Sequence, residues 1–235
     1  MKTLIIGGNS DLAVEYIKIN FKKEKFFFVV RNKEKFKKTL NENSLNVSND
    51  QVYKLDLVQS NSVYSLINII MKNKINNIII CSTLYNNSDN LQNSESNLSI
   101  LDINFTFVIK FLSLINNVIK YKFNIILFGS IASFAGRKNN IIYSASKRAL
   151  NSFIESFIVS CNSNIYLQYY ILGYLNTVKN KNKNISSYLC ANTTNIVYKT
   201  LHMRFLKSSI FILPRYWIIL KYLSVFNLYL FIRNI

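Results

Sequence analysis

The order of apolar segments along the chain limits its fold more than any other feature of the sequence. Through the first two thirds, short apolar runs alternate with longer segments whose apolar residues recur at helical spacing, which is typical of βαβ units and a parallel sheet. The runs are dense in Ile, Val, Phe, Tyr and Leu, as strands buried on both faces require. Strands are therefore predicted at residues 3–6, 26–30, 52–55, 78–81, 124–128, 165–171 and 209–213.

The segments of helical period fill the gaps between these strands. They predict one α/β domain, a doubly wound parallel sheet of about seven strands flanked by helices on both faces. The segment that follows the sixth strand is a candidate lid, because open sheets bind ligands at the carboxyl ends of their strands. Helices are predicted at residues 12–21, 60–72, 100–120, 143–161 and 193–206, and loops at 86–97 and 179–187.

The chain is strongly basic, with 29 Lys and Arg against 11 Asp and Glu and a formal net charge of +18. Such a charge alone would suggest nucleic acid or an anionic membrane as a partner. Lys, Asn and Ile are frequent throughout, however, and no aromatic-basic recognition motif accompanies the charge, which favours a general compositional bias. No specific nucleic-acid partner is therefore expected, although the positive charge can help to hold phosphorylated ligands.

Cysteine usage and the amino terminus bear on the cellular compartment. Cys81, Cys161 and Cys190 are odd in number, widely spaced and without a Cys-x-x-Cys pair, so neither a disulfide framework nor a metal site is expected. Met1 leads straight into the first predicted strand without the pattern of a signal peptide. A cytoplasmic location is therefore expected.

A polar turn follows the first predicted strand and leads into the first helix. At that place glycines allow close backbone approach, and the helix amino terminus offers partial positive charge to a pyrophosphate. An ordinary strand-to-helix turn can have a similar composition. The position nevertheless predicts the phosphate-binding turn of a Rossmann-like dinucleotide fold, formed by Gly7, Gly8, Asn9, Ser10, Asp11 and Leu12.

The end of the second predicted strand bears on the choice of nicotinamide cofactor. No acidic residue stands there to hydrogen-bond a ribose 2′-hydroxyl, whereas Arg31 can bind a 2′-phosphate through paired guanidinium donors. NADP(H) is therefore preferred and NAD(H) remains the alternative. A solvated arginine at a strand end is the plainer explanation of the same residue.

A serine after the fifth predicted strand and a Tyr–Lys pair at the start of the next helix carry the most chemistry. Tyr143 and Lys147 are four residues apart and so share one helix face, and the loop after Ser130 is long enough to return the tyrosine to the serine. The ordinary pKa of a tyrosine, about 10, falls beside a cation. Lys147 is therefore expected to let Tyr143 act as an acid and base.

In this order and spacing, these residues resemble the short-chain dehydrogenase/reductase superfamily, whose hallmark is Tyr-x-x-x-Lys preceded by a strand-terminal serine. The resemblance spans nearly the whole chain. It implies an NAD(P)-dependent oxidoreductase that transfers hydride between the cofactor and a small alcohol or ketone substrate, and a homo-oligomer. It further implies that Ser130 polarises the substrate oxygen, that Lys147 also binds the nicotinamide ribose, and that Asn104 helps to hold a water for proton relay.

Two further segments resemble cofactor contacts of the same superfamily. Asp56 and Leu57 resemble the adenine-contacting pair after the third strand. The segment from Gly173 to Thr177 resembles the Pro-Gly-x-x-x-Thr segment that borders the nicotinamide, with Leu172 in the place of the proline. The resemblance thus implies cofactor contacts after the third and the sixth predicted strand.

The sequence also departs from the superfamily pattern. Asp11 and Ala13 stand where glycines are usual, and Cys81, Ser82 and Thr83, which are expected to bind the cofactor, stand where Asn-Asn-Ala is usual. Asp11 would weaken pyrophosphate binding unless its side chain turns outward or caps the helix. These departures keep an alternative open, a non-catalytic nucleotide-binding protein with a regulatory or interaction role.

The glycine turn and the tail suggest where the protein acts. The turn also resembles that of the reductase subunit of decaprenylphosphoryl-ribose epimerase, which implies a sugar or lipid-linked substrate in cell-envelope polysaccharide synthesis.

Residues 1–213 are expected to form the NAD(P)-binding domain. The tail, 214–235, is apolar between basic ends and rich in Tyr and Trp, so it is expected to form a helix. Its alternatives are peripheral contact with the inner face of the membrane, packing on the domain, and a dimer contact.

Overall fold

A computed structural model describes residues 1–85, 94–136, 140–176 and 189–225. Its centre is a seven-stranded sheet in the order β3-β2-β1-β4-β5-β6-β9, in which every neighbouring pair is parallel. All seven predicted strands are therefore confirmed. They are β1 (Lys2–Ile6), β2 (Lys25–Val30), β3 (Val52–Lys54), β4 (Asn77–Ile80), β5 (Phe123–Ser130), β6 (Ile165–Leu172) and β9 (Ser209–Leu213).

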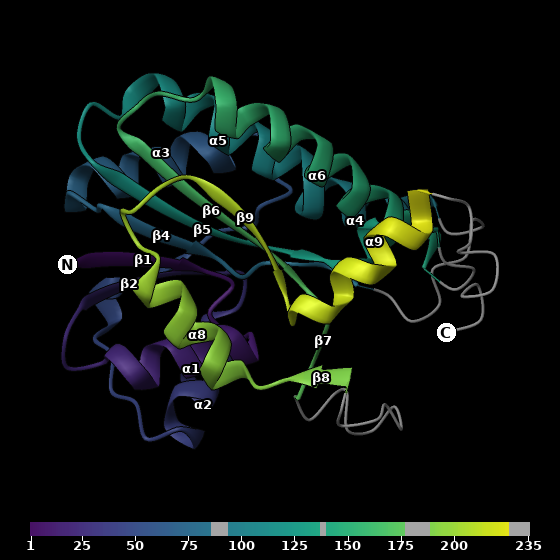
Figure 1. The fold of residues 1–235 in the computed structure, drawn as a ribbon. Coiled ribbons are helices and arrows are strands. Elements are labelled where there is room, and N and C mark those ends of the chain that lie inside the picture. Colours follow the sequence, from purple (N-terminus) through teal and green to yellow (C-terminus); the bar gives the residue numbers. More distant parts are fainter. Residues whose placement is uncertain (86–93, 137–139, 177–188, 226–235) are drawn as a thin grey trace.

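Helices cover both faces of this sheet, as Figure 1 shows. The first face carries α1 (Asp11–Asn20), α2 (Lys33–Glu42) and α8 (Thr193–His202). The second carries α3 (Ser62–Asn73), α5 (Phe107–Val118) and α6 (Ile141–Ser160), with α4 (Ser94–Leu101) against α6. The predicted doubly wound α/β fold, Rossmann-like in its layers and strand order, is confirmed.

The sheet divides the hydrophobic core into two clusters. Successive side chains of a strand point to opposite faces, so Phe27 and Val29 of β2 belong to one cluster and Phe28 and Val30 to the other. Because both faces are covered, the strands are apolar along almost their whole length. The strand order reverses between β1 and β4, and in sheets of this kind ligands bind outside the carboxyl ends of the strands at that reversal.

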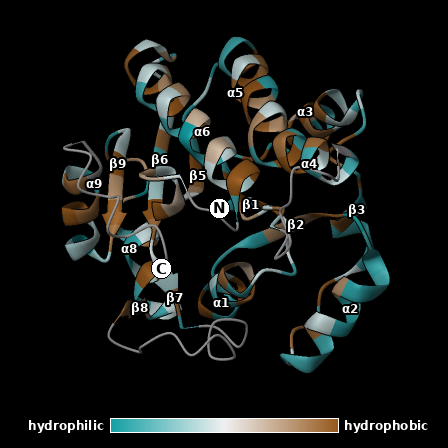
Figure 2. Ribbon diagram, turned by 90° about the vertical axis from the view of Figure 1, so that its right-hand side faces the viewer, coloured by the Kyte–Doolittle hydropathy of each residue, from teal (hydrophilic) through white to brown (hydrophobic). Residues whose placement is uncertain are grey.

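Helix α2 was not expected from the sequence. It is lysine-rich and appears in Figure 2 almost entirely in hydrophilic colours. Only Phe36 and Leu40 are buried among its ten residues. Two apolar residues four apart are enough to anchor a ten-residue helix on the sheet, but they are too few to stand out from a polar background.

The loop predicted at residues 86–97 is wrong in its last part. Helix α4 begins at Ser94, and Asn97 and Ile100 are buried where α4 packs against α6. From there the chain continues through a π-helical turn (Asp102–Thr106) into α5. The polar Asn/Ser composition concealed this helix, because burial of one face outweighs weak helix propensity.

Some predicted elements lie outside the described residues. These include the candidate lid at residues 179–187 and the last ten residues of the tail, 226–235. On either side of the lid segment the chain forms a short parallel pair, β7 (Tyr174–Leu175) and β8 (Cys190–Ala191), which the sequence did not suggest.

The described part of the tail lies against the domain. A 3-10 turn (Arg215–Trp217) leads into α9 (Ile218–Val225), so the tail helix begins four residues later than expected. Leu220 is buried and Trp217 packs on the same cluster as α6. Ile219 and Tyr222 are exposed on the same helix.

Among the described residues, one helical segment, Glu95–Val118, has the length and apolar composition of a membrane span. It is the α4–α5 segment. Phe107, Phe111 and Ile115 of this segment are buried in the core. One apolar face of the segment therefore packs on the domain.

Candidate active site

The turn after β1 is pressed against the end of β4. Gly7 has a φ of +84°, and a Cβ at this position would lie 2.7 Å from the backbone nitrogen of Ser82. Both observations require glycine. Ser10 caps α1, because its Oγ accepts a hydrogen bond from the Ala13 backbone nitrogen at 3.1 Å. The turn therefore presents the amino end of α1 at the place where the strand order reverses.

The side chains of this turn face in different directions. Gly8 lies against the ring of Phe36, and Leu12 is buried in the core. Asn9 is exposed, and its Oδ1 accepts a hydrogen bond from Thr39 on α2 at 3.1 Å. Asp11 is exposed and does not cap α1, a role that Ser10 fills. Of the two conditions under which the charge of Asp11 would be tolerated, capping of the helix is therefore not met.

Two residues at the end of β4, Cys81 and Ser82, differ in whether their side chains have a partner. The Cys81 thiol is buried beside Ser10, and burial raises its pKa to about 12, which keeps it neutral. The hydroxyl oxygen of Ser82 is buried and has no hydrogen-bond partner among the described residues. Buried polar atoms are normally paired. Together with the glycine turn and the amino end of α1, the unpaired Ser82 hydroxyl fits a bound dinucleotide.

Arg31 and Asp56 lie at neighbouring strand ends. Arg31 is exposed between the end of β2 and Asn32, the residue that caps α2. In the described ranges it makes no ion pair, so its guanidinium is available to an anion. Asp56 accepts a hydrogen bond from the Val58 backbone nitrogen at 3.2 Å, and Leu57 packs on the core.

Asn104 lies in the π-helical turn and connects three elements. Its Oδ1 accepts hydrogen bonds from the Thr83 hydroxyl at 3.0 Å and the Leu84 backbone nitrogen at 2.9 Å. Its Nδ2 donates to the Leu84 carbonyl at 2.8 Å and to Ser146 of α6 at 3.3 Å. All donors and acceptors of the amide are thereby used. The expected role of holding a water is not available to this side chain, which instead fixes the chain after β4.

Ser130 is the last residue of β5. Its Oγ accepts a hydrogen bond from the Ala132 backbone nitrogen at 3.2 Å. An oxygen that accepts in this way keeps its own proton for a further acceptor. Ser130 can therefore donate a hydrogen bond to a substrate oxygen.

Tyr143 and Lys147 lie one turn apart on α6, and Lys147 faces the sheet. Its Nζ is 5.8 Å from the centroid of the Tyr143 ring and donates to the Phe128 carbonyl at 3.5 Å. The lysine is 3% exposed and forms no salt bridge with a carboxylate of the described residues. Burial lowers its pKa to about 8.

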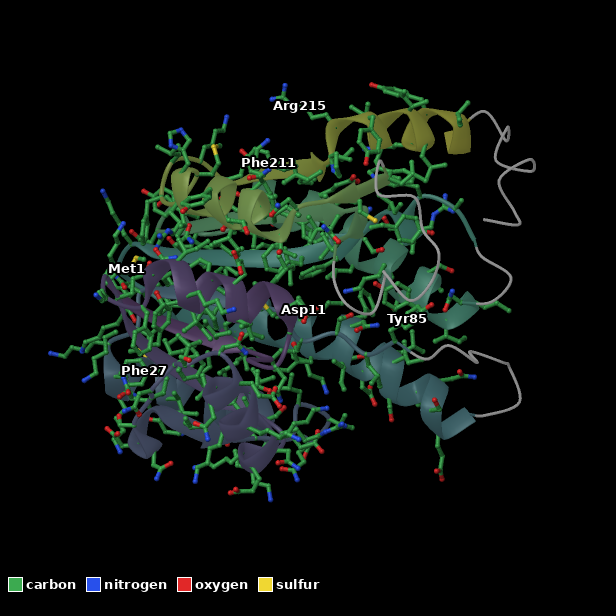
Figure 3. The ribbon with its side chains drawn as sticks, turned by 90° about the horizontal axis from the view of Figure 1, so that it is seen from below. Met1, Asp11, Phe27, Tyr85, Phe211 and Arg215 are labelled. Carbon is green, nitrogen blue, oxygen red and sulfur yellow. The ribbon has the colours of Figure 1, made fainter. Side chains whose placement is uncertain are left out.

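The sequence did not single out Tyr85, which follows β4. Its ring meets that of Tyr143 edge to face, with centroids 5.2 Å apart and planes at 90°. Figure 3 shows Tyr85 toward the side of the molecule opposite Met1, with Asp11 between the two. The sequence did offer one signal for Tyr85, since it is an aromatic residue just after the segment Cys81 to Thr83, which departs from the superfamily pattern.

The remaining predicted contacts lie after β6. The backbone nitrogen of Gly173 donates to the Leu213 carbonyl at 2.9 Å, and Trp217 lies against its Cα. Thr177 lies outside the described residues. Within the described ranges, no three His, Cys, Asp or Glu side chains come together as a metal site.

Comparison with sequence families gives one match. A model of the short chain dehydrogenases matches residues 2–187. No curated protein matches the sequence.

Solved structures are similar in fold. A short-chain type dehydrogenase/reductase from Mycobacterium ulcerans has a TM-score of 0.75 at 12% identity, over 90% of this chain and 87% of that one. A short chain dehydrogenase family protein from Francisella tularensis has a TM-score of 0.70 at 16% identity, over 90% and 96%. A variant of the actinorhodin polyketide ketoreductase with NADPH has a TM-score of 0.72 at 12% identity, over 90% and 95%. At these identities the similarity shows the fold alone.

Burial of Lys147 predicts a pH-dependent stability. Between pH 8 and 10.5 the folded chain has lost this proton and the unfolded chain still holds it, so the free energy of unfolding rises with pH. Over that window the wild type should gain about 3 kcal/mol relative to Lys147→Met. Urea unfolding of both proteins across the window measures the difference.

Lys110→Met, at an exposed position on α5, is the control and should keep the wild-type pH dependence. If the wild type and Lys147→Met respond to pH in parallel, Lys147 does not have a lowered pKa.

Proposed function

The chain belongs to the short chain dehydrogenase family of oxidoreductases, and we propose that it transfers hydride between NADP(H) and an alcohol or carbonyl group, with Tyr143 moving the proton. The family uses NAD(P)(H) and acts on small molecules. One observation carries the finer proposal. The buried Lys147 ammonium lies 5.8 Å from the Tyr143 ring centroid, on the helix that packs against the strand ending at Ser130.

The chemistry assigns a role to each of these side chains. A bound nicotinamide supplies or accepts the hydride. Reduction of a carbonyl leaves negative charge on its oxygen, to which Ser130 can donate a hydrogen bond and Tyr143 a proton. The positive charge of Lys147 then stabilises the phenolate that remains. In the oxidative direction the same phenolate takes the proton of the alcohol.

Side chains and amides at three strand ends are suited to hold the nucleotide. The amides of residues 7–12 at the start of α1 suit a pyrophosphate. The unpaired Ser82 hydroxyl suits a polar group of the nucleotide. Arg31, exposed and without an acidic partner in the described chain, suits a 2′-phosphate and favours NADP(H) over NAD(H).

The rival function is a protein that binds the nucleotide without turnover. It remains open because Asp11 and Ala13 replace glycines of the turn. A sugar or lipid-linked substrate, a homo-oligomeric state and a cytoplasmic location stay predictions for this chain.

Replacing Tyr143 by phenylalanine tests the catalytic proposal. The change removes the hydroxyl and keeps the ring against Tyr85, so kcat/KM for reduction should fall by about 100- to 10,000-fold while NADPH still binds. The measurement is NADPH oxidation with a panel of ketones and aldehydes, beside an NADPH titration by fluorescence.

Tyr64→Phe is the matched control, because Tyr64 is 64% exposed on α3. It should keep wild-type turnover. NADPH binding by the wild type with no turnover of any carbonyl compound would favour the non-catalytic rival.

Replacing Arg31 tests the cofactor preference. Loss of a charge-assisted contact with the 2′-phosphate should raise the Kd of NADPH by about 10- to 100-fold in Arg31→Ala and leave that of NADH nearly unchanged. Lys38→Ala, an exposed cation on α2, is the control. Equal affinity of the wild type for the two cofactors would overturn the preference.

We propose in addition that the tail binds an anionic membrane peripherally. On its described part Ile218, Ile219 and Tyr222 are exposed, and the exposed cations Arg215 and Lys221 lie in the same segment, with Lys221 3.9 Å from a carboxylate oxygen of Glu155. Apolar side chains with flanking cations bind anionic lipid surfaces.

Vesicle flotation tests the tail. The wild type should float with phosphatidylserine-containing vesicles and not with purely zwitterionic ones, and Ile219→Glu should reduce flotation severalfold. Val159→Glu, at an 86% exposed position on α6, is the control. Absence of the wild type from the anionic vesicle fraction would refute membrane contact.

A further inference from the structure

A hydrogen-bonded chain connects β6 to the turn that carries Ser130. The Tyr169 hydroxyl donates to Asn151 Oδ1 at 2.6 Å, and Asn151 Nδ2 donates to Ser133 Oγ at 2.8 Å. Ser133 in turn donates to the backbone carbonyl of Ser130 at 2.7 Å. The chain therefore ends on the peptide of the residue to which the proposed function assigns the substrate oxygen.

Asn151 continues the face of α6 that carries the proposed chemistry. Tyr143, Lys147 and Asn151 are spaced four residues apart, so they lie along one side of the helix. Lys147 bonds the carbonyl of Phe128, and Asn151 bonds the turn beyond Ser130. The same helix face is thus fastened to the strand before Ser130 and to the turn after it.

Tyr169 can take part only because residue 129 has no side chain. A Cβ on Gly129 would lie 2.2 Å from the Tyr169 hydroxyl oxygen. The two residues are diagonal neighbours on β5 and β6, since Tyr169 pairs with Leu127. The tyrosine hydroxyl therefore passes directly beside the peptide that precedes Ser130.

The direction of each hydrogen bond is fixed by chemistry. Burial raises the pKa of Tyr169 well above its usual value, and the charges of Tyr143 and Glu155 act in the same direction. Tyr169 consequently stays protonated and keeps a proton to donate. The Ser130 carbonyl can only accept, so Ser133 donates its proton there and accepts from the amide nitrogen of Asn151. The amide oxygen of Asn151 therefore faces Tyr169 and accepts its proton. All three hydrogen bonds thus run in one donor-to-acceptor direction, and together they hold the turn after Ser130 in one orientation.

We infer that Asn151, supported by Tyr169 and acting through Ser133, is a positioning residue that sets the orientation of Ser130 toward the substrate oxygen. This inference rests on the proposed function. None of the three needs to touch substrate or cofactor. A shift of the Ser130 hydroxyl from its productive position weakens its hydrogen bond in the transition state more than it weakens ground-state binding.

Two variants with a double-mutant cycle test the inference, using the ketone of the panel that the wild type reduces fastest. Asn151→Ala should lower kcat by about 10- to 100-fold, with the KM for the ketone and the Kd for NADPH changed less than twofold. Tyr169→Phe keeps the ring beside Gly129, removes only the hydroxyl and should lower kcat in the same sense. If both act through one chain, the double variant is no worse than Asn151→Ala alone.

Tyr166→Phe is the matched control, because it removes a hydroxyl from the same strand at a position away from this chain. Its kcat should equal that of the wild type. If Asn151→Ala and Tyr169→Phe merely fold less well, a smaller fraction of each variant binds NADPH, but kcat per NADPH-binding site equals that of the wild type. That result would overturn the positioning role.

The outcomes separate this inference from the proposed function. Unchanged kcat in Asn151→Ala and Tyr169→Phe, with activity lost in Tyr143→Phe, refutes the positioning role alone. Additive effects in the double variant also refute a shared chain. A wild type that reduces no carbonyl compound refutes the proposed function, and the positioning role with it.

Discussion

The burial of one ammonium group, that of Lys147, is the constraint on which the candidate site depends. Withdrawing a cation from water without a carboxylate partner disfavours its charged form, which is why its pKa is lowered to about 8. The packing of α6 on β5 and the two hydrophobic clusters around the sheet offset that cost. As a result, the charge of Lys147 lies near the aromatic ring of Tyr143 and is shielded from bulk solvent. In this buried place it interacts with Tyr143 more strongly than it would on the surface.

Much of the fold could be predicted because its strands are buried on both faces. Such strands read as continuous apolar runs, and all seven were found. Helix α2 and most of α4 were missed, since only a few of their residues are buried and their composition resembles that of loops. The pattern of apolar residues along a sequence shows which whole segments are buried more clearly than it shows the burial of one or two residues in a polar segment.

The candidate site was accessible from the sequence only where spacing carries the information. Tyr143 and Lys147 share a helix face by their separation, and Ser130 follows a recognisable strand. The bonds of Asn151 and Tyr169 were not accessible, because they join residues from two elements and depend on the absent side chain of Gly129. The contacts of Asn104 were missed for a similar reason, since a π-helical turn leaves no clear trace in residue spacing. At the end of β4, Ser10 and Cys81 make a local contact, and Cys81 stands where the superfamily has asparagine.

Trp217 has a consequence of a different kind. It is the only tryptophan of the chain, and its ring lies between the tail and the backbone of Gly173, with Tyr174 edge-on at 5.9 Å. All indole emission of the protein therefore originates at one point, where the tail joins the end of β6. The wavelength and intensity of Trp217 fluorescence therefore report whether the tail packs against the domain, and they do so in the unlabelled protein.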